Sequence, residues 1–182
     1  MFNPTTDRIF LRSATLDDAE SIAMVRIDSW RKTYRGVIPD SYLDSMDLES
    51  STNLWRRVLA AASVATSVFV AELDGEVVGF AAGKMLEKEK FGLDAELAAI
   101  YLRPEIQRAG VGQSLVRMVA SEHHSQGANG LIAWVLSRNK IARQFYEKLG
   151  AELLIEQPFN WDGMDLVEAG YGWRDLSRFK PH

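Results

Sequence analysis

The chain has 182 residues, of which 47% are hydrophobic and 25% are charged, and its formal net charge is −4. This length and composition are typical of one globular domain, so we expect a single domain over residues 1–182. The acidic balance argues against nucleic acid as a partner. The chain has no cysteine, which excludes disulfides, thiolate metal sites and a cysteine nucleophile.

The first residues contain no basic region followed by an apolar core, and no apolar run approaches membrane-spanning length. We therefore expect no secretory signal and no membrane partner. The lack of cysteine fits a reducing compartment, so a cytoplasmic location is predicted.

Apolar periodicity and helix-breaking residues predict the elements of the N-terminal half. They are a strand over 9–12, a helix opened by Thr15, a loop over 32–40, a helical stretch over 40–62, and strands over 67–73 and 76–84. Asp74-Gly75 joins the last two strands and is a strong hairpin signal.

The C-terminal half mixes strands and helices in the same way. Its predicted elements are a polar loop over 87–94, a strand over 96–102, a glycine loop over 107–112, a helix to about residue 126, a strand over 131–136, a helix over 139–149, and strands over 151–156 and 166–173. The whole order is β-α-α-β-β-β-α-β-α-β-β, which predicts an α/β domain with a mixed sheet rather than regular βαβ alternation.

The glycine loop, Gln107-Arg108-Ala109-Gly110-Val111-Gly112, lies where a strand gives way to a helix. A helix N-terminus has unpaired N–H groups and a partial positive charge, and glycine lets a phosphate approach them. A nucleoside triphosphate loop would need lysine and a hydroxyl after its last glycine, whereas Gln113 and Ser114 follow here, and a dinucleotide loop would need a third glycine. The segment is therefore either a shorter anion-binding loop, with Arg108 able to pair with phosphate, or a tight turn that requires glycine.

The helix over 139–149 has two distinct lines of side chains. The predicted buried stripe, spaced by four residues, consists of Ile141, Phe145 and Leu149. The second line, about 100° away around the helix, consists of Asn139, Arg143 and Tyr146. It is either a solvated face with a half-buried tyrosine or the wall of a site.

Two further features have competing interpretations. Glu96 heads a strand, where carboxylates are disfavoured, and is either a strand-end surface residue or a base beside a site. His123 and His124 are adjacent and lack a third ligand at useful spacing, so we predict surface histidines and no metal site. The tryptophans at 134, 161 and 173 are predicted to be packing residues.

Two segments of the chain together carry a family resemblance. Residues 97–112, LAAIYLRPEIQRAGVG, are similar to a strand, an x-Pro step and a Gln/Arg-x-x-Gly-x-Gly cofactor motif. Residues 139–150, NKIARQFYEKLG, are similar to an Asn-x-x-Ala-x-x-Phe-Tyr-x-x-x-Gly helix. In this order, with a strand between them, the two motifs resemble those of the GNAT superfamily of acyl-CoA-dependent N-acetyltransferases. The resemblance implies a single-domain GNAT-like α/β fold, with a mixed, mostly antiparallel central sheet of about seven strands flanked by helices.

The resemblance also implies acetyl-CoA as the donor. Its pyrophosphate would lie on the glycine loop, and its pantetheine arm would pair with the strand before that loop, where this strand parts from the one over 131–136. The cofactor-binding residues implied are Ile100, Tyr101, Leu102, Gln107, Arg108, Ala109, Gly110, Val111, Gly112, Ser114, Asn139, Arg143 and Tyr146.

For such a protein the expected reaction is attack of a primary amine on the thioester. An alkylamine is mostly protonated at neutral pH, so a base is needed, and Glu96 acting through a water is the candidate. A backbone N–H near Ile100 would stabilise the oxyanion, and Tyr146 would protonate the leaving thiolate. No metal is required.

The acceptor is expected at the loop between the first two helices, and it would be a small molecule or a peptide amine. That region contains Trp30, Tyr34 and Tyr42, the acidic residues Asp40, Asp44 and Asp47, and the basic residues Arg31, Lys32 and Arg35. Aromatic rings with carboxylates suit a cationic amine, although the local charge is mixed. The alternatives are a non-catalytic acyl-CoA sensor or binding module and a protein N-acyltransferase. The resemblance also allows a homodimer.

Overall fold

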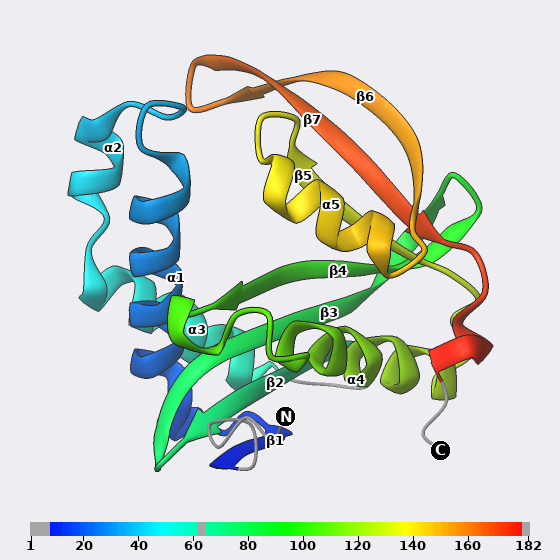
Figure 1. The fold of residues 1–182 in the computed structure, drawn as a ribbon, viewed down its shortest axis with the longest axis horizontal. Helices are drawn as coiled ribbons and strands as arrows, with labels where there is room; N and C mark the ends of the chain where they lie inside the picture. The colour runs from blue at the N-terminus through cyan, green and yellow to red at the C-terminus, as the bar shows by residue number, and fades with distance from the viewer. Residues whose placement is uncertain (1–7, 62–64, 180–182) are drawn as a thin grey trace.

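Within residues 8–61 and 65–179, which the computed structural model describes, seven strands form one sheet (Figure 1). The strands are β1 (Ile9–Ser13), β2 (Thr66–Leu73), β3 (Glu76–Lys90), β4 (Leu93–Leu102), β5 (Leu131–Leu136), β6 (Glu152–Trp161) and β7 (Met164–Trp173). The α-helices are α1 (Ala19–Tyr34), α2 (Asp40–Ser45), α3 (Leu48–Ala60), α4 (Val111–Ser125) and α5 (Lys140–Lys148). Short 3-10 helices are η2 (Leu16–Asp18), η3 (Pro104–Ile106) and η4 (Leu176–Phe179).

The strand order is β1-β2-β3-β4-β5-β7-β6, and every neighbouring pair is antiparallel except β4 and β5. A parallel pair needs a crossover, and α4 supplies it between β4 and β5. The prediction of a mixed, mostly antiparallel seven-stranded α/β sheet is confirmed.

Helices cover the sheet on both sides. Buried side chains of α4 and Tyr146 of α5 share one cluster with alternate residues of β3, β4, β5 and β7. The intervening residues of β2 and β3 pack with α1 and α3 in a second cluster. Figure 1 shows α4 running beside β3, and α5 lying along β5 and β7. The period-2 alternation of the strands thus separates two cores.

Two predicted boundaries are wrong. The stretch expected as one helix over 40–62 is two helices, because Asp47 accepts a hydrogen bond from Ser50 N at 2.6 Å and caps a new helix; residue 62 lies outside the described residues. The loop expected over 87–94 is mostly strand, because Phe91 and Gly92 both have positive φ and turn the β3–β4 hairpin tightly.

His123, predicted to be a surface residue, is fully buried. Its Nε2 lies 3.0 Å from the Oγ of Ser67 on β2. The ring fits against β3 because residue 83 is glycine, where a Cβ would lie 2.7 Å from His123 Nε2. Burial lowers the pKa of His123, so the ring is neutral at neutral pH.

Trp173, predicted to be a packing residue, is 1% exposed, and its Nε1 donates to Leu149 O at 3.1 Å. None of the described helices is both long and apolar enough to cross a membrane.

Candidate functional site

The glycine loop leads into α4 with its backbone donors uncapped. Gly110 is the N-cap, with φ of 80°, and no side chain caps the helix. The first turn of α4 contains no acidic residue. Gln107 and Arg108 are exposed, whereas Val111 and Gly112 are buried. The unpaired N–H groups of this turn and the nearby guanidinium group suit an anion.

Glycine is also required at position 112 for packing, independently of anion binding. A Cβ at this position would lie 3.1 Å from Leu102 Cδ1 and 3.1 Å from Phe145 Cζ. The glycine therefore lets α4 approach both β4 and α5. The loop had two interpretations, a tight turn that requires glycine and an anion-binding loop. Close packing explains Gly112, and the exposed turn before it remains the candidate for anion binding.

The edge of β4 is open beyond its first residues. β4 and β5 pair only from Ala95–Leu131 to Leu97–Ala133, after which the two strands part. A register shift on the β3 side lets Ala98 bulge at the same point, where Ala82 faces Ala99 and Gly83 faces Leu97. The structure thus places the opening between the two strands where the sequence analysis expected it.

The backbone of the open β4 edge can pair with an extended ligand. Arg103 N donates to Val78 O on β3 at 2.8 Å, so by strand alternation the backbone groups of Ile100 and Leu102 point away from β3. The Leu102 carbonyl accepts from Gln107 Nε2 at 3.0 Å. Ile100 N–H, Ile100 C=O and Leu102 N–H are left facing the opening.

Three tyrosines are close enough to affect one another's pKa values, and we call them the tyrosine group: Tyr34 of α1, Tyr101 of β4 and Tyr146 of α5. Burial, followed by the proximity of Tyr101 and Tyr34, holds the pKa of Tyr146 well above its ordinary value. Burial and Tyr34 likewise raise the pKa of Tyr101 to about 12. All three phenols therefore keep their protons at neutral pH.

The members of the tyrosine group are fixed by specific contacts. Trp30 Nε1 donates to the Tyr101 hydroxyl at 2.8 Å. The Asn139 side chain is close enough to Tyr34 to oppose the rise that burial causes in its pKa, and Asn139 Oδ1 accepts from Ala142 N at 3.1 Å, capping α5. Tyr34 of α1 thus lies close to Asn139 at the start of α5.

The two lines predicted on α5 are arranged differently from the expectation. Ile141 is 81% exposed, so its assignment to the buried stripe is wrong. Tyr146 is the buried residue instead, at 6% exposure, because its ring packs against Tyr171 at 5.9 Å and Trp173 at 5.7 Å from β7. Tertiary partners from another strand decided which face of α5 is buried.

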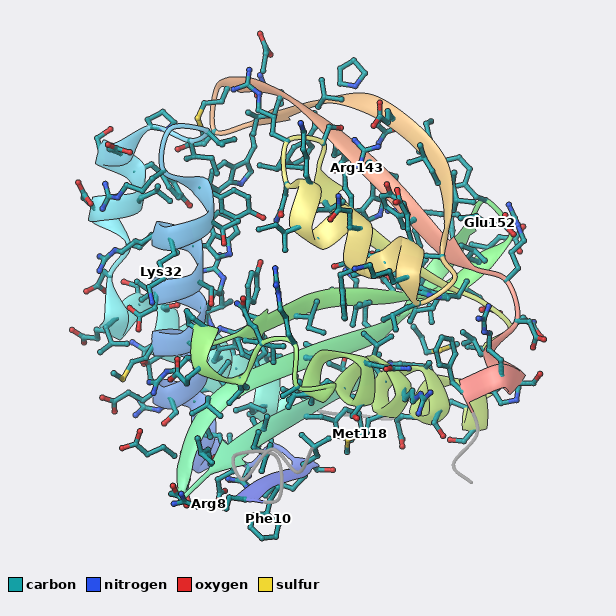
Figure 2. All side chains as sticks on the ribbon, viewed as in Figure 1. Arg8, Phe10, Lys32, Met118, Arg143 and Glu152 are labelled. Carbon is teal, nitrogen blue, oxygen red and sulfur yellow. The ribbon has the colours of Figure 1, made fainter. Side chains whose placement is uncertain are left out.

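Arg143 points away from the tyrosine group. Its Nε donates to the Tyr171 hydroxyl at 2.9 Å, and its Nη1 donates to Ser137 O at 3.2 Å and pairs with Glu156 Oε1 at 2.6 Å. Figure 2 shows Arg143 between α5 and the β6–β7 pair. The guanidinium group thus anchors α5 to the sheet, whereas Asn139 and Tyr146 come together at the opening.

Glu96 lies on the sheet face opposite α4. Its neighbours Ala95 and Leu97 belong to the cluster with α4, so by alternation the Glu96 side chain points to the other face. The side chain is only 15% exposed, and Lys84 Nζ lies 3.7 Å from its Oε2. It is thus a half-buried carboxylate two residues before the bulge.

The region between α1 and α2 is held together by its own charged groups. Arg35 pairs with Asp44 at 2.5 Å and with Asp40 at 3.6 Å. Arg31 donates to backbone oxygens of Leu43 and Met46. With Asp47 capping α3, the charges expected around an acceptor mostly have structural partners.

The aromatic residues of that region gather around one side chain that the sequence analysis did not connect with them. Trp161, at the tip of the β6–β7 hairpin, lies 5.4 Å from the ring of Trp30 and 4.5 Å from that of Tyr42. Asp162-Gly163, both with positive φ, make the turn that brings this tip to α1 and α2. Asp162-Gly163 was the sequence signal that could have located Trp161, because Asp-Gly between two strand-like runs predicts a hairpin.

Two other features lie away from this site. A surface hollow of about 560 Å³, lined by Leu16, Asp17, Glu20, Arg56 and Arg57 among others, is at the opposite end of α1 from Tyr34. Among the described residues, no three His, Asp or Glu side chains gather to hold a metal ion.

Comparisons with known proteins concern the family and the fold of the chain. A family model described as the acetyltransferase (GNAT) family matches residues 24–151. The uncharacterized N-acetyltransferase YuaI of Bacillus subtilis is 36% identical over 173 residues, which cover 94% of this chain and 96% of the relative. Spermidine N(1)-acetyltransferase of Thermoplasma acidophilum is 26% identical over 162 residues, covering 87% of this chain and 94% of the relative. The crystal structure of PaiA N-acetyltransferase from Thermoplasma acidophilum, in complex with coenzyme A, superposes with a TM-score of 0.68 at 23% identity, covering 88% of this chain and 97% of the other.

Proposed function

Because the chain belongs to the acetyltransferase (GNAT) family, we propose that it transfers an acetyl group from acetyl-CoA to a primary amine by direct attack. One observation supports this above all. The part of β4 that has parted from β5 carries Tyr101, which is close enough to the buried phenol of Tyr146 to help raise its pKa. A thioester laid along that part of β4 would have a proton donor at its sulfur.

The glycine loop and the β4 edge together suit acetyl-CoA. The uncapped first turn of α4 and the exposed Arg108 offer donors for a pyrophosphate. Ile100 and Leu102 offer backbone groups to an amide-containing arm, as an added strand would use them. Asn139, whose side chain affects the pKa of Tyr34, would reach the same arm.

In the proposed reaction, Glu96 accepts a proton from the ammonium group of the acceptor through a water molecule. The neutral nitrogen then attacks the thioester carbonyl, and the developing oxyanion is stabilised by Ile100 N–H. As the tetrahedral intermediate collapses, the C–S bond breaks and Tyr146 donates its proton to the thiolate. Burial keeps that proton on Tyr146 until this step. The amide nitrogen gives up its surplus proton, and a proton returned through water restores the phenol.

The acceptor in this proposal is a small amine. The Thermoplasma relative is named for spermidine, and the half-buried Glu96 lies on the sheet face that also contacts α1 and α3. The aromatic rings of Trp30, Tyr42 and Trp161 stand at the edge of that face. Aromatic rings and a carboxylate favour a cationic amine over an anionic acceptor.

A thiol-release assay with acetyl-CoA and a panel of polyamines, amino acids, aminoglycosides and short peptides tests the proposal. We expect release that depends on a small amine, with an acetylated product seen by mass spectrometry. Coenzyme A binding by calorimetry without turnover of any amine would favour an acyl-CoA sensor. Acylation confined to protein substrates would favour a protein N-acyltransferase.

A further inference from the structure

One face of the sheet beyond Glu96 has no role in the proposal above. We call it the Trp134 face and define it by Trp134, Leu136, Ile155, Gln157 and Glu168. Strand alternation and two contacts place these side chains together. A Cβ at Gly170 would lie 2.9 Å from the Trp134 ring and 3.3 Å from Ile155 Cγ2, so both side chains cover Gly170. Gln157 Nε2 donates a hydrogen bond to Glu168 Oε1 at 2.7 Å.

The Trp134 face continues from Glu96 on the same side of the sheet. Ile132 faces Glu96 in the β4–β5 register, and Trp134 follows two residues later on the same side of β5. Ala133 and Val135 point instead into the cluster with α4. The proposed base and the Trp134 face thus share one surface.

Both ends of this surface are bounded by packed side chains. At one end, the β3–β4 hairpin places Phe91 6.4 Å from the Trp134 ring and Lys90 Nζ 5.8 Å from it. At the other end, Leu136 and Trp161 pack with the cluster of Tyr34, Ile38 and Leu43. Between the two ends, all five residues of the Trp134 face remain half-buried.

Glu168 is distinguished from nearby carboxylates by its partners. Glu156 pairs with Arg143, Glu152 with Arg174, and Glu96 with Lys84. Within the described part of the chain, Glu168 has no ion pair, and its recorded side-chain partner is the neutral amide of Gln157. A half-buried carboxylate is better stabilised when a cation pairs with it, and this one retains acceptor capacity.

The strand register fixes the separation between Glu168 and Glu96. Glu168 faces Leu136, four residues beyond the Ile132 that faces Glu96. At about 3.3 Å per residue and about 4.8 Å per strand, the two Cα atoms lie roughly 16 Å apart. Both side chains extend from the same face, so their carboxylates are about as far apart as the Cα atoms. A direct hydrogen bond of about 3 Å at Glu168 and about 6 Å through one water at Glu96 leave roughly 7 Å between the two bound nitrogen atoms.

We propose that Glu168 binds a second cationic group of the acceptor, so that the acceptor is a linear amine with a further positive charge roughly 7 Å from the nitrogen that is acetylated. This inference rests on the proposed function. The methylene chain that joins the two nitrogens of the acceptor would cross Trp134, whose ring can contact both methylene groups and cations. Monoamines would lack the interaction with Glu168.

Steady-state kinetics of the wild type and of Glu168→Gln test the assignment, with linear diamines of increasing length and monoamines of matched length. We expect the wild type to favour a diamine of intermediate length. The variant should raise KM for that diamine about three- to tenfold, the scale of a partly exposed ion pair, with kcat and the monoamine kinetics unchanged. Asp165→Asn is the matched control, since Asp165 is exposed on the same strand and its side chain points to the opposite face.

Equal loss for monoamines and diamines in Glu168→Gln would overturn the inference, as would a wild type that does not distinguish the two classes. Calorimetric binding of the same series of diamines to the complex with coenzyme A separates this question from the proposed function. If no amine is acetylated, the proposed function fails, and the diamine that the wild type binds most tightly, bound more weakly by Glu168→Gln, still decides whether the site exists. Equal binding by the two proteins would rule it out.

Discussion

The two halves of the proposed site are built in different ways. The donor half comes from one continuous part of the chain, running from β4 through the glycine loop, α4 and β5 to Tyr146. The acceptor half is assembled from α1 and α2, the tip of the β6–β7 hairpin, and single residues such as Glu96 and Glu168. These parts meet only in the folded protein.

This difference has a physical origin. The donor half uses backbone groups, namely a helix N-terminus and an open strand edge, so its side chains need only be small or absent. The acceptor half must distinguish one amine from another, and only side chains can do so. We therefore expect substitutions in the donor half to act on all acceptors alike, and those in the acceptor half, apart from the proposed base Glu96, to act selectively.

The largest effect is expected for Tyr146→Phe in the donor half. This change removes the proposed proton donor and keeps the ring that packs on Tyr171 and Trp173. We expect kcat to fall about 10²- to 10³-fold with every amine, the usual contribution of a general acid. Stopped-flow or steady-state thiol release measures this fall in kcat. We expect the affinity for coenzyme A, measured by calorimetry, to be nearly unchanged.

Tyr171→Phe is the matched control for that variant. Tyr171 is fully buried and neighbours Tyr146, but its hydroxyl bonds Arg143 and Glu147 rather than facing the open edge. It should lower the melting temperature and leave kcat intact. Similar kcat values for Tyr146→Phe and the wild type would remove Tyr146 from the acid role.

The next effect in size is expected for Glu96→Gln. We expect kcat/KM to fall about 100-fold at neutral pH, because the acceptor ammonium loses its base. The loss should shrink as pH rises towards the pKa of the amine, since more acceptor is then already neutral. Glu89→Gln, an exposed change on the same hairpin, should leave the pH profile unchanged, and a loss independent of pH would argue for a structural role of Glu96.

A smaller effect, confined to the donor, is expected for Gly110→Asp. Asp and Asn both tolerate the positive φ of Gly110 and both cap helices. Nothing lies within 4 Å of a Cβ there, so Asp mainly adds a negative charge beside the proposed pyrophosphate. We expect KM for acetyl-CoA to rise about tenfold more than in the neutral control Gly110→Asn, and equal KM values would place the pyrophosphate elsewhere.

The same contrast explains what could be predicted from the sequence. The glycine loop and the Asn139–Tyr146 helix are local patterns, so the fold, the family and the opening at β4 followed from them. Glu168 was not predicted, because one glutamate in a half-buried strand has no local signature. Ile141 and His123 were wrongly placed because their burial depends on distant partners: β7 rings bury Tyr146 instead of Ile141, and Ser67 and Gly83 make room for His123.

The smallest expected effect concerns stability and again falls on the donor half. His123 holds α4 against β2 and β3, and its pKa is lowered mainly by burial, with Gly83, Gln126 and Glu122 acting in the opposite direction. The unfolded chain therefore binds a proton more readily than the folded one. The contribution of His123 to stability is fully present above pH of about 6.5 and declines as pH falls below that value.

This decline should reach at most about 1.4 kcal/mol per pH unit, the slope for one proton. Chemical denaturation between neutral and mildly acidic pH measures it, and His123→Gln, which can keep a hydrogen bond to Ser67, should show a flatter dependence. His124→Gln is the matched control, because His124 is only partly buried, with its Nδ1 3.1 Å from Ala128 O. Equal slopes for the wild type and His123→Gln would mean that other groups cause the acid sensitivity. A steeper loss in the wild type, with weaker acetyl-CoA binding but unaltered preference among amines, would show that the two halves of the site can be weakened separately.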